Sequence, residues 1–363
     1  MKTQPKLKTY QKKVSSFINS ITPKDKIALF HDIDGDGLFA TGLLIKALQR
    51  LNLKPILLIG IGREEISPSK NTIKRLKNAG ITKLFILDKP SDIDLEAIKQ
   101  IEKFSDILII DHHKIFGKAP SKRTTIIKPQ FFTKIPPSGY PTAKMIYTLF
   151  SKLVDLTDLD WMAAAGTMSD TASGDWIVRD VVKKYGFKDK DPWDTPLGKL
   201  ENYISLSALH KSGDHNTSLK ILIESNTYED VLNSKLKKPY IAVYGEIQKH
   251  IKKFKRISEF KDDLVFCSIK PKYKINTPFL TIMSVKYYPN HTLVLITDFP
   301  PNKSRISFRR NDFKKDTSNI AREAIKGFKQ AQGGGHAPAS GAIILKKDLE
   351  EFKRRVEKLN KEA

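Results

Sequence analysis

Short apolar runs alternate with amphipathic stretches along the first part of the chain. Runs of strand length occupy residues 26–31, 54–60, 83–88 and 106–111. Between them lie segments with apolar residues at helical spacing, at 37–52, 70–80 and 91–104. Strands that are apolar on both faces and alternate with helices are typical of a parallel sheet covered by helices. The pattern therefore predicts an α/β fold.

The pattern changes further along the chain. It predicts a strand at 124–129 and helices at 138–154 and 157–170, then a mostly helical, basic region at 176–258 that includes a connecting helix beginning at 246. Beyond it, short β-rich runs occupy 264–271, 279–288, 292–299 and 304–310. A helix at about 315–330, a glycine cluster, a strand at 342–345 and a terminal helix complete the prediction.

The length and this change of pattern predict two domains. The chain has 363 residues, and a domain typically has roughly 100–200. We expect residues 1–258 to form the domain with the parallel sheet and flanking helices, with 176–258 as a helical extension and connector. Residues 259–363 would form a smaller α/β domain, with a cleft between the two.

Charge makes a polyanionic partner a leading explanation for the composition. Lys and Arg number 64 against 40 Asp and Glu, a formal net charge of +24. Such an excess could serve solubility or reflect lysine-rich coding, but phosphate backbones bind basic surfaces by Coulomb attraction and counterion release. We favour nucleic acid over the plainer explanations.

The remaining composition indicates a cytoplasmic location. The single cysteine, Cys267, excludes an internal disulfide framework and a zinc site built from cysteines. No run approaches the ~18 apolar residues of a membrane span, so no membrane association is expected. The basic segment 1–21 has the pattern of an amphipathic helix and not that of a signal peptide.

Acidic residues stand where the predicted strands end. Asp34 and Asp36 follow the first strand in "HDIDGDG" (31–37), Asp88 ends the third, and Asp111 ends the fourth. The carboxyl ends of parallel strands share one sheet edge, where ligand crevices form, and carboxylates crowded there require protons or cations. With His31 and His112 the donors are mixed oxygen and nitrogen, which suits Mn²⁺ better than Mg²⁺.

Plainer explanations exist for some of these residues. "HDIDGDG" resembles a calcium loop, but the predicted strand before it and helix after it do not fit a helix–loop–helix site. Asp88 alone could cap the next helix, and Asp170, after a small-residue segment, could cap a helix or point into the crevice. The pair His112 and His113 after a buried strand is the least compatible with simple core packing.

Taken together, these motifs resemble the DHH phosphoesterases. That family includes RecJ-type single-strand exonucleases, oligoribonucleases, cyclic-dinucleotide phosphodiesterases and some inorganic pyrophosphatases. "HDIDGDG", the strand end at Asp88, "DHH" (111–113) and "GTMSDT" (166–171) resemble its first four motifs. "GGGHAPASGA" (333–342), with the preceding strand "SRISFRR" (304–310), resembles the signature of the DHH-associated C-terminal domain.

The resemblance implies two Mn²⁺ ions that activate water, with Mg²⁺ as a possible substitute. His31, Asp34 and Asp88 would hold one ion. Asp36, Asp88, His112 and Asp170 would hold the other, so that Asp88 bridges both. His113 would face the scissile phosphate, and Asp111 would orient the histidines, so the catalytic residues would be His113, Asp111 and Asp88.

The second domain is expected to hold substrate. The glycines at 333–335 expose backbone N–H groups that can cradle phosphate, although a hinge or turn would use the same residues. Arg309 can make bidentate contacts to phosphate. The predicted substrate-binding residues are Arg309, Ser307, Gly334, Gly335 and His336.

These features predict a Mn²⁺-dependent phosphodiesterase, of the archaeal RecJ-like kind, that hydrolyses single-stranded DNA or RNA from an end. The alternative is an oligoribonuclease or a phosphodiesterase for linear or cyclic dinucleotides, with short oligonucleotides as substrates. An inactive replication or helicase-associated scaffold is less compatible, because no motif residue is missing. A replication or repair protein is a further expected partner.

Overall fold

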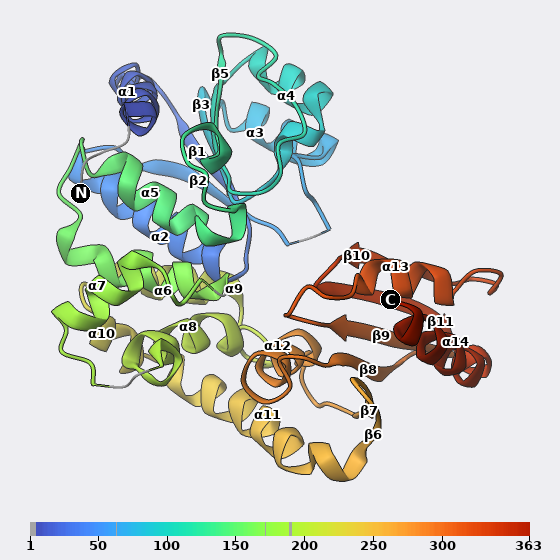
Figure 1. Ribbon diagram of the computed structural model, residues 1–363. Helices are drawn as coiled ribbons and strands as arrows, with labels where there is room; N and C mark the ends of the chain where they lie inside the picture. The colour runs from blue at the N-terminus through green and yellow to red at the C-terminus, as the bar shows by residue number, and fades with distance from the viewer. Residues whose placement is uncertain (1–4, 63, 171, 189–190) are drawn as a thin grey trace. The chain divides into compact units, whose positions relative to one another are not determined.

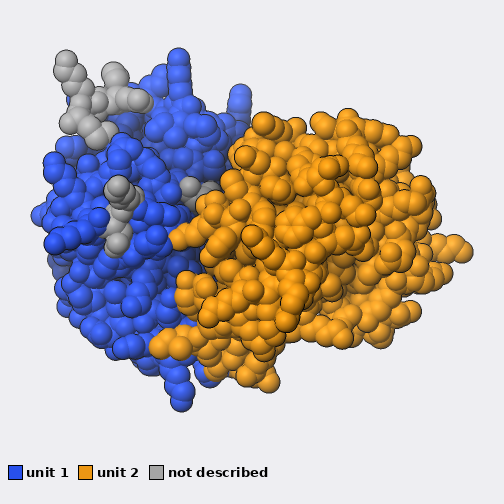
Figure 2. Space-filling view, turned by 60° about the horizontal axis from the view of Figure 1, so that its bottom comes forward, with its two compact units in different colours: residues 1–208, 212–240 blue, residues 209–211, 241–363 orange. Residues whose placement is uncertain are grey.

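The computed structural model describes residues 5–62, 64–170, 172–188 and 191–363 (Figure 1). The chain divides into two compact units, one made of Met1–Ala208 with Ser212–Tyr240, and one made of Leu209–Lys211 with Ile241–Ala363 (Figure 2). The predicted boundary after residue 258 lies just beyond helix α11 (Lys237–Ile257), within which the units divide. That finer boundary stays a prediction.

The described part of the first unit contains a parallel five-stranded sheet in the order β2-β1-β3-β4-β5. The strands are β1 (Ile27–His31), β2 (Pro55–Gly60), β3 (Lys83–Leu87), β4 (Asp106–Ile110) and β5 (Thr124–Ile127). The predicted α/β fold with a parallel sheet is therefore confirmed. The strands β1, β3 and β4 are buried along both faces, as apolar runs without polar alternation require.

Helices cover both faces of this sheet (Figure 1). On one face, α3 (Lys70–Asn78) and α4 (Leu95–Glu102) pack on side chains that include Phe30, Ile86 and Ile109. On the other lie α2 (Gly35–Arg50) and α5 (Thr142–Phe150). Helix α1 (Pro5–Asn19) packs beside α5 and sets Phe17 edge-on to Phe85 of β3 at 5.3 Å.

Helix α2 is buried along almost its whole length. The small-residue helix α6 (Asp160–Ser169) packs on α2 and α5. Gly166 explains the close approach, because a Cβ there would lie 2.4 Å from the Cβ of Ala143 and 2.9 Å from that of Phe39. The helices α7 (Trp176–Lys184), α8 (Pro196–Ser207), α9 (His215–Glu224) and α10 (Tyr228–Leu232) follow, as the helical pattern predicted.

The second unit is built on a six-stranded mixed sheet in the order β10-β11-β9-β8-β7-β6, counted over the described residues. The strands are β6 (Ser258–Lys261), β7 (Leu264–Ser268), β8 (Thr292–Phe299), β9 (Lys303–Arg309), β10 (Gln332–His336) and β11 (Ala339–Leu345). Helices α13 (Thr317–Ala324) and α14 (Leu349–Glu362) pack on one face around Ile306 and Phe308. The predicted second α/β unit is therefore present.

Two local predictions in this unit are wrong. The run 279–288, expected to be a strand, lies in helix α12 (Asn276–Ile282) and in the π-helical turn Met283–Tyr287. Its buried residues Phe279, Leu280, Met283 and Ser284 repeat with helical spacing, which its β-branched composition concealed. The glycine cluster, expected between elements, forms the edge strand β10.

The glycines of β10 adopt backbone conformations that other residues rarely use. Gly335 has φ +141°, and a Cβ there would lie 2.6 Å from the carbonyl oxygen of Ala339. A tight hairpin to β11 therefore needs glycine at this position.

In the described part of the chain, no helix is both long and apolar enough to cross a membrane.

Candidate metal centre

The strands of the first unit end level with one another at the carboxyl edge of the sheet. His31 pairs in register with Leu87, Leu87 with Ile110, and Ile110 with Ile127. The residues that follow, Asp88, Asp111 and Lys128, therefore leave the sheet side by side. Asp88 turns sharply away from β3 with φ +56°, a left-handed conformation that Asp tolerates better than most residues.

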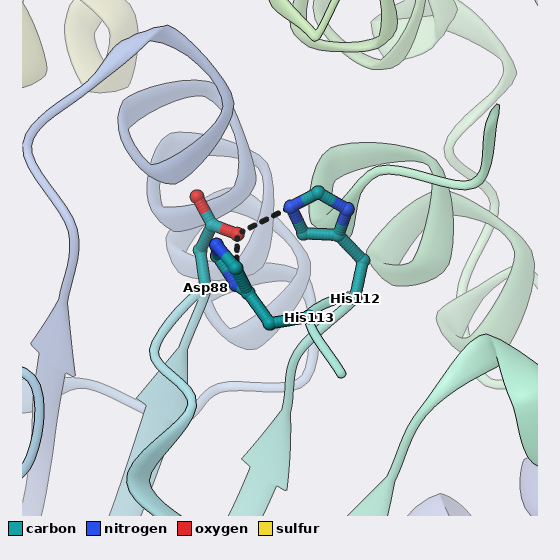
Figure 3. A group of neighbouring side chains, drawn as sticks. All are labelled: Asp88, His112 and His113. Carbon is teal, nitrogen blue, oxygen red and sulfur yellow. Dashed lines mark ion pairs between the residues drawn. The ribbon is translucent and has the colours of Figure 1, made fainter. Parts of the chain in front are cut away.

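Two histidine rings lie against the Asp88 carboxylate (Figure 3). Its Oδ1 is 3.3 Å from Nε2 of His112 and 3.9 Å from Nδ1 of His113. Both Asp88 and His112 are buried, whereas the side chain of His113 is 43% exposed. The site therefore has a closed interior at Asp88 and an open side at His113.

Nε2 of His112 also lies 3.1 Å from Oδ2 of Asp170, at the C-terminal end of α6. Nδ1 of the same ring is 3.1 Å from the carbonyl oxygen of Pro137, and a carbonyl only accepts, so Nδ1 carries a proton. In the neutral ring, the lone pair on Nε2 would then face two carboxylates. That arrangement is stable only if a proton or a cation lies between them.

Asp36 completes this group from the first turn of α2. Its carboxylate accepts hydrogen bonds from the backbone N–H groups of Thr142 at 2.6 Å and Ala143 at 2.9 Å, at the start of α5. The hydroxyl of Thr142 donates to Oδ1 of Asp88 at 3.0 Å. Thr142 thus holds two of the clustered carboxylates, a role that the sequence pattern does not indicate.

The described residues contain two sets of donor atoms that are spaced closely enough to share a cation. One set is Asp88, His112 and His113, and the other is Asp36, His112 and Asp170. Burial and the charges of neighbouring carboxylates raise the pKa of Asp36 and of Asp170 above their usual values. Burial acts on Asp88 in the same direction, but its hydrogen bond to His112 and the charges of both histidines lower its pKa.

This donor set fits a divalent cation. Carboxylate oxygens and imidazole nitrogen together suit Mn²⁺, and a cation would relieve both the carboxylate crowding and the conflict at Nε2 of His112. The predicted ligands Asp36, Asp88, His112 and Asp170 are gathered in one place. Their individual roles remain predictions.

The other predicted ligands are arranged differently. His31 is buried, with Nδ1 at 2.7 Å from the carbonyl oxygen of Asp32, and its Nε2 has no hydrogen-bond partner among the described residues. Asp34 caps α2 by accepting from the N–H of Gly37 at 3.0 Å. Loss of solvation and the charges of Asp88, Asp32 and Asp170 raise the pKa of Asp34. The structure does not bring the His31 ring within that cluster.

Asp111 lies behind the cluster and contacts His113. Its Oδ1 is 2.7 Å from Nδ1 of His113, and its Oδ2 accepts from Nζ of Lys128 at 2.7 Å. Burial alone would raise the pKa of Asp111, but the hydrogen bond to His113 and the charge of Lys128 hold it below its usual range. Nζ of Lys128 is also 2.8 Å from Oδ1 of Asp92, and all three side chains of this Asp92–Lys128–Asp111 triad are fully buried.

Lys128 could have been found from the sequence. It follows the apolar run of β5 directly, just as Asp111 follows that of β4, so a parallel register aligns the two residues. The strand prediction at 124–129 contained this information. Asp92 gives no comparable signal, because it lies in the short helical turn Ser91–Ile93 after β3. Only the folded conformation of that turn brings it to Lys128 and Asp111.

Four of the five predicted substrate-binding residues share one face of the second unit's sheet, whereas Gly335 aligns with Ser340 and Phe308 on the other face. Alternation along β9 turns Ile306 and Phe308 into the core and places Ser307 and Arg309 on the opposite face. Register aligns Ser307 with Gly341 and Gly334, and Arg309 with Ala339 and His336. Their role in substrate binding stays a prediction.

A buried carboxylate on α8 supports the helix that carries Asp36. Glu201 is 8% exposed and accepts from the hydroxyl of Ser205 at 2.6 Å. The Ser205 hydroxyl in turn packs against Gly35, where a Cβ would lie 2.9 Å from it. Burial raises the pKa of Glu201 to about 7.

Replacing Glu201 by Gln is expected to stabilise the protein more at pH 8 than at pH 5. Well below pH 4.5 the carboxyl group is protonated in both states. As the pH rises towards 7, only the unfolded state ionises freely, which costs the native state up to about 3 kcal/mol. Urea unfolding at several pH values measures this difference. Exposed Glu224→Gln is the control, and a Glu201→Gln effect independent of pH would contradict the argument.

No family model matches the chain, but relatives are found by sequence and by structure. The single-stranded-DNA-specific exonuclease RecJ of Bacillus subtilis (strain 168) is 28% identical over 162 residues, which are 42% of this chain. The match spans only 20% of the length of that protein.

Solved structures match nearly the whole chain. Exonuclease RecJ bound to manganese gives a TM-score of 0.68 at 15% identity, covering 98% of this chain and 94% of that one. A DHH domain from a protein assigned to a family of ribosomal proteins gives 0.72 at 17% identity, covering 97% and 91%. A pGpG-specific phosphodiesterase from Vibrio cholerae gives 0.56 at 13% identity, covering 93% and 100%. The predicted resemblance to RecJ-like DHH phosphoesterases is therefore confirmed.

Proposed function

We propose, from the relationship to RecJ-like DHH phosphoesterases, that this chain is a metal-dependent phosphodiesterase that hydrolyses single-stranded nucleic acid from an end. The observation that carries the proposal is the cluster of Asp36, Asp88, His112 and Asp170 at one sheet edge. Such a group of buried donors is poorly stable without a cation, and metal-assisted hydrolysis is the chemistry for which it is suited.

We assign Asp36, His112 and Asp170 to one ion and Asp88 to a position between two ions. His31 and Asp34 are proposed for the second ion, because the buried Nε2 of His31 lacks a partner among the described residues and Asp34 caps the start of α2, two residues before Asp36. Bound Mn²⁺ would supply Lewis acidity, which activates water and neutralises charge on phosphate oxygens.

The protein's own residues would orient the substrate. The contact between Nδ1 of His113 and Asp111 fixes the tautomer and leaves Nε2 directed away from Asp111. The partly exposed His113 ring is therefore placed to contact the scissile phosphate from the open side of the site. Lys128 holds Asp111 in turn, so the orientation of His113 depends on a fully buried ion pair.

The product ladder from end-labelled oligonucleotides tests this function. With Mn²⁺, 20-mers of single-stranded DNA and RNA should be shortened progressively from one end, and EDTA should stop the reaction. Intact substrates after prolonged incubation with Mn²⁺ or Mg²⁺ would contradict the proposal. Internal fragments without end-derived products would contradict hydrolysis from an end.

The second candidate is a phosphodiesterase for linear or cyclic dinucleotides. It is supported by the fold match to the pGpG-specific enzyme, which covers all of that chain and 93% of this one. The two candidates share their chemistry and differ in substrate length. Faster turnover of a 2-mer than of a 20-mer at equal concentration would favour the dinucleotide enzyme. A replication or repair protein as partner stays a prediction.

Arg309→Ala is expected to raise KM about tenfold or more while leaving the affinity for Mn²⁺ unchanged, because a hydrogen bond to a charged group contributes about 1.5–3 kcal/mol. Steady-state kinetics on an oligonucleotide and metal titration calorimetry measure the two quantities. Arg322→Ala, on the exposed side of α13, is the matched control. An unchanged KM would remove Arg309 from the proposed substrate contacts.

A further inference from the structure

A basic groove in the first unit lies apart from the metal centre. It has a volume of about 1110 Å³ and runs between α1 and the segment 115–126, which connects β4 to β5 and includes most of β5. None of the clustered metal-centre residues lines it. It reaches Asp106 at the amino end of β4, whereas His112 and His113 follow the carboxyl end of that strand.

The cations of the groove exceed its acidic groups. Its lining includes Lys12 and Lys13 on α1, and Lys118, Lys122 and Arg123 on the facing segment, all exposed. The described lining contains one carboxylate, Asp106, which is already paired with Lys83 at 2.9 Å and with Arg123 at 2.7 Å. Neither residues 6–19 nor residues 114–123 contain Asp or Glu. Positive charge therefore remains available on both walls for an anionic ligand.

Aromatic and apolar side chains lie between these cations. The Tyr10 ring stacks on Phe131 at 5.8 Å, and Nζ of Lys13 lies 4.9 Å from the centre of the Tyr10 ring. Ile115 is 39% exposed on the facing segment. Cations that flank aromatic and apolar side chains suit a single-stranded nucleic acid, whose phosphates pair with lysine while its bases contact the apolar surface.

The groove is also connected to the metal centre by the chain. The segment that forms one wall begins two residues after His113, and it is fixed there by hydrogen bonds from the N–H groups of Phe116 and Gly117 to Asp92, at 2.8 and 3.2 Å. Asp92 in turn contacts Lys128. One wall of the groove is thus continuous with the segment that positions His113.

We propose that this groove binds the backbone of a single-stranded nucleic acid outside the catalytic centre, so that a long substrate is held at two places. This inference rests on the proposed function for its choice of ligand. The edge strand β5 would also admit an acidic peptide as an added strand. The unneutralised cations on both walls, together with the Tyr10 and Phe131 stack, favour nucleic acid.

The test measures binding of a single-stranded oligonucleotide under conditions in which it is not hydrolysed. Fluorescence anisotropy with a labelled 30-nucleotide oligothymidylate in EDTA measures affinity for the full chain across a salt series. The double variant Lys12→Glu/Lys122→Glu, which reverses charge on both walls, should weaken binding at least tenfold and reduce the salt slope by about 1.4 for two lost phosphate contacts. Lys358→Glu/Lys361→Glu on the exposed side of α14 makes the same change of net charge and should have a much smaller effect.

The outcomes separate this inference from the proposed function. Hydrolysis of a dinucleotide with Mn²⁺ should be equal in the unmodified chain and the groove variant. If neither protein hydrolyses the dinucleotide or any oligonucleotide, the proposed function fails. The anisotropy measurement would still decide whether the groove binds single-stranded nucleic acid. Equal weakening by both double variants would overturn the inference. The inference would also be overturned if the groove variant bound oligothymidylate as tightly as the unmodified chain but lost affinity for a polyglutamate peptide. That result would assign the groove to an acidic protein segment.

Discussion

Asp88→Asn is expected to lower kcat for Mn²⁺-dependent phosphodiester hydrolysis by about 10³-fold or more while leaving the fold intact. Oδ1 of Asp88 lies 3.3 Å from Nε2 of His112 and accepts from the hydroxyl of Thr142 at 3.0 Å. Asn keeps the shape and the carbonyl acceptor but removes the negative charge that would hold two cations together. Several kcal/mol of transition-state stabilisation would be lost with those cations.

Asn is a better test than Ala at this position. Asp88 has φ +56°, where Ala would be strained and Asn is tolerated. Asp262→Asn provides the matched control, because Asp262 adopts a similar φ of +54° in the second unit. Calorimetric titration should show weakened Mn²⁺ binding for Asp88→Asn only. Turnover near that of the unmodified chain would refute the metal-bridging role of Asp88.

The parts of the site that follow directly from strand order could be predicted from the sequence. Asp88, Asp111 and His112 stand immediately after apolar runs, and a parallel sheet brings such positions to one edge. The apolar runs themselves predicted β1, β3 and β4 within one residue at each end. Local pattern and the register of the sheet determine these features together.

Features that depend on crossing connections could not be predicted in this way. Thr142 reaches Asp36 and Asp88 only because α5 begins beside them, 54 residues after Asp88 in the chain. The glycines of β10 could be assigned to a strand only once β11 was known to pair with them. His31 was placed among the ligands by its position at a strand end and by resemblance, whereas its side-chain direction depends on the packing of its ring against Gly60.

The largest expected effect on stability concerns Lys128. Its Nζ lies between two buried carboxylates, 2.7 Å from Asp111 and 2.8 Å from Asp92, and donates to the carbonyl oxygen of Lys114 at 2.8 Å. Lys128→Met would retain most of the apolar stem and leave both carboxylates without their cation. Removing one partner from a buried ion pair typically costs about 3–5 kcal/mol, so unfolding in urea should occur at a clearly lower midpoint.

The pH dependence distinguishes this mechanism from a simple packing defect. In the unmodified chain, the hydrogen bond to His113 and the charge of Lys128 outweigh the effect of burial and keep the pKa of Asp111 low. A group with a depressed native pKa contributes stability above its unfolded pKa, and that stability is lost as the pH falls. Without Lys128 part of that contribution disappears, so the deficit of Lys128→Met should be larger at pH 8 than at pH 4.

Two further variants complete the test of the buried triad. Asp92→Asn should partly restore the stability of Lys128→Met, because it removes one uncompensated charge while its carbonyl oxygen can still accept from the N–H of Phe116. Lys99→Met breaks an exposed pair with Glu96 and should cost under about 0.5 kcal/mol. A cost for Lys128→Met as small as that of Lys99→Met, or no recovery with Asp92→Asn, would show that the triad does not stabilise the segment carrying His113.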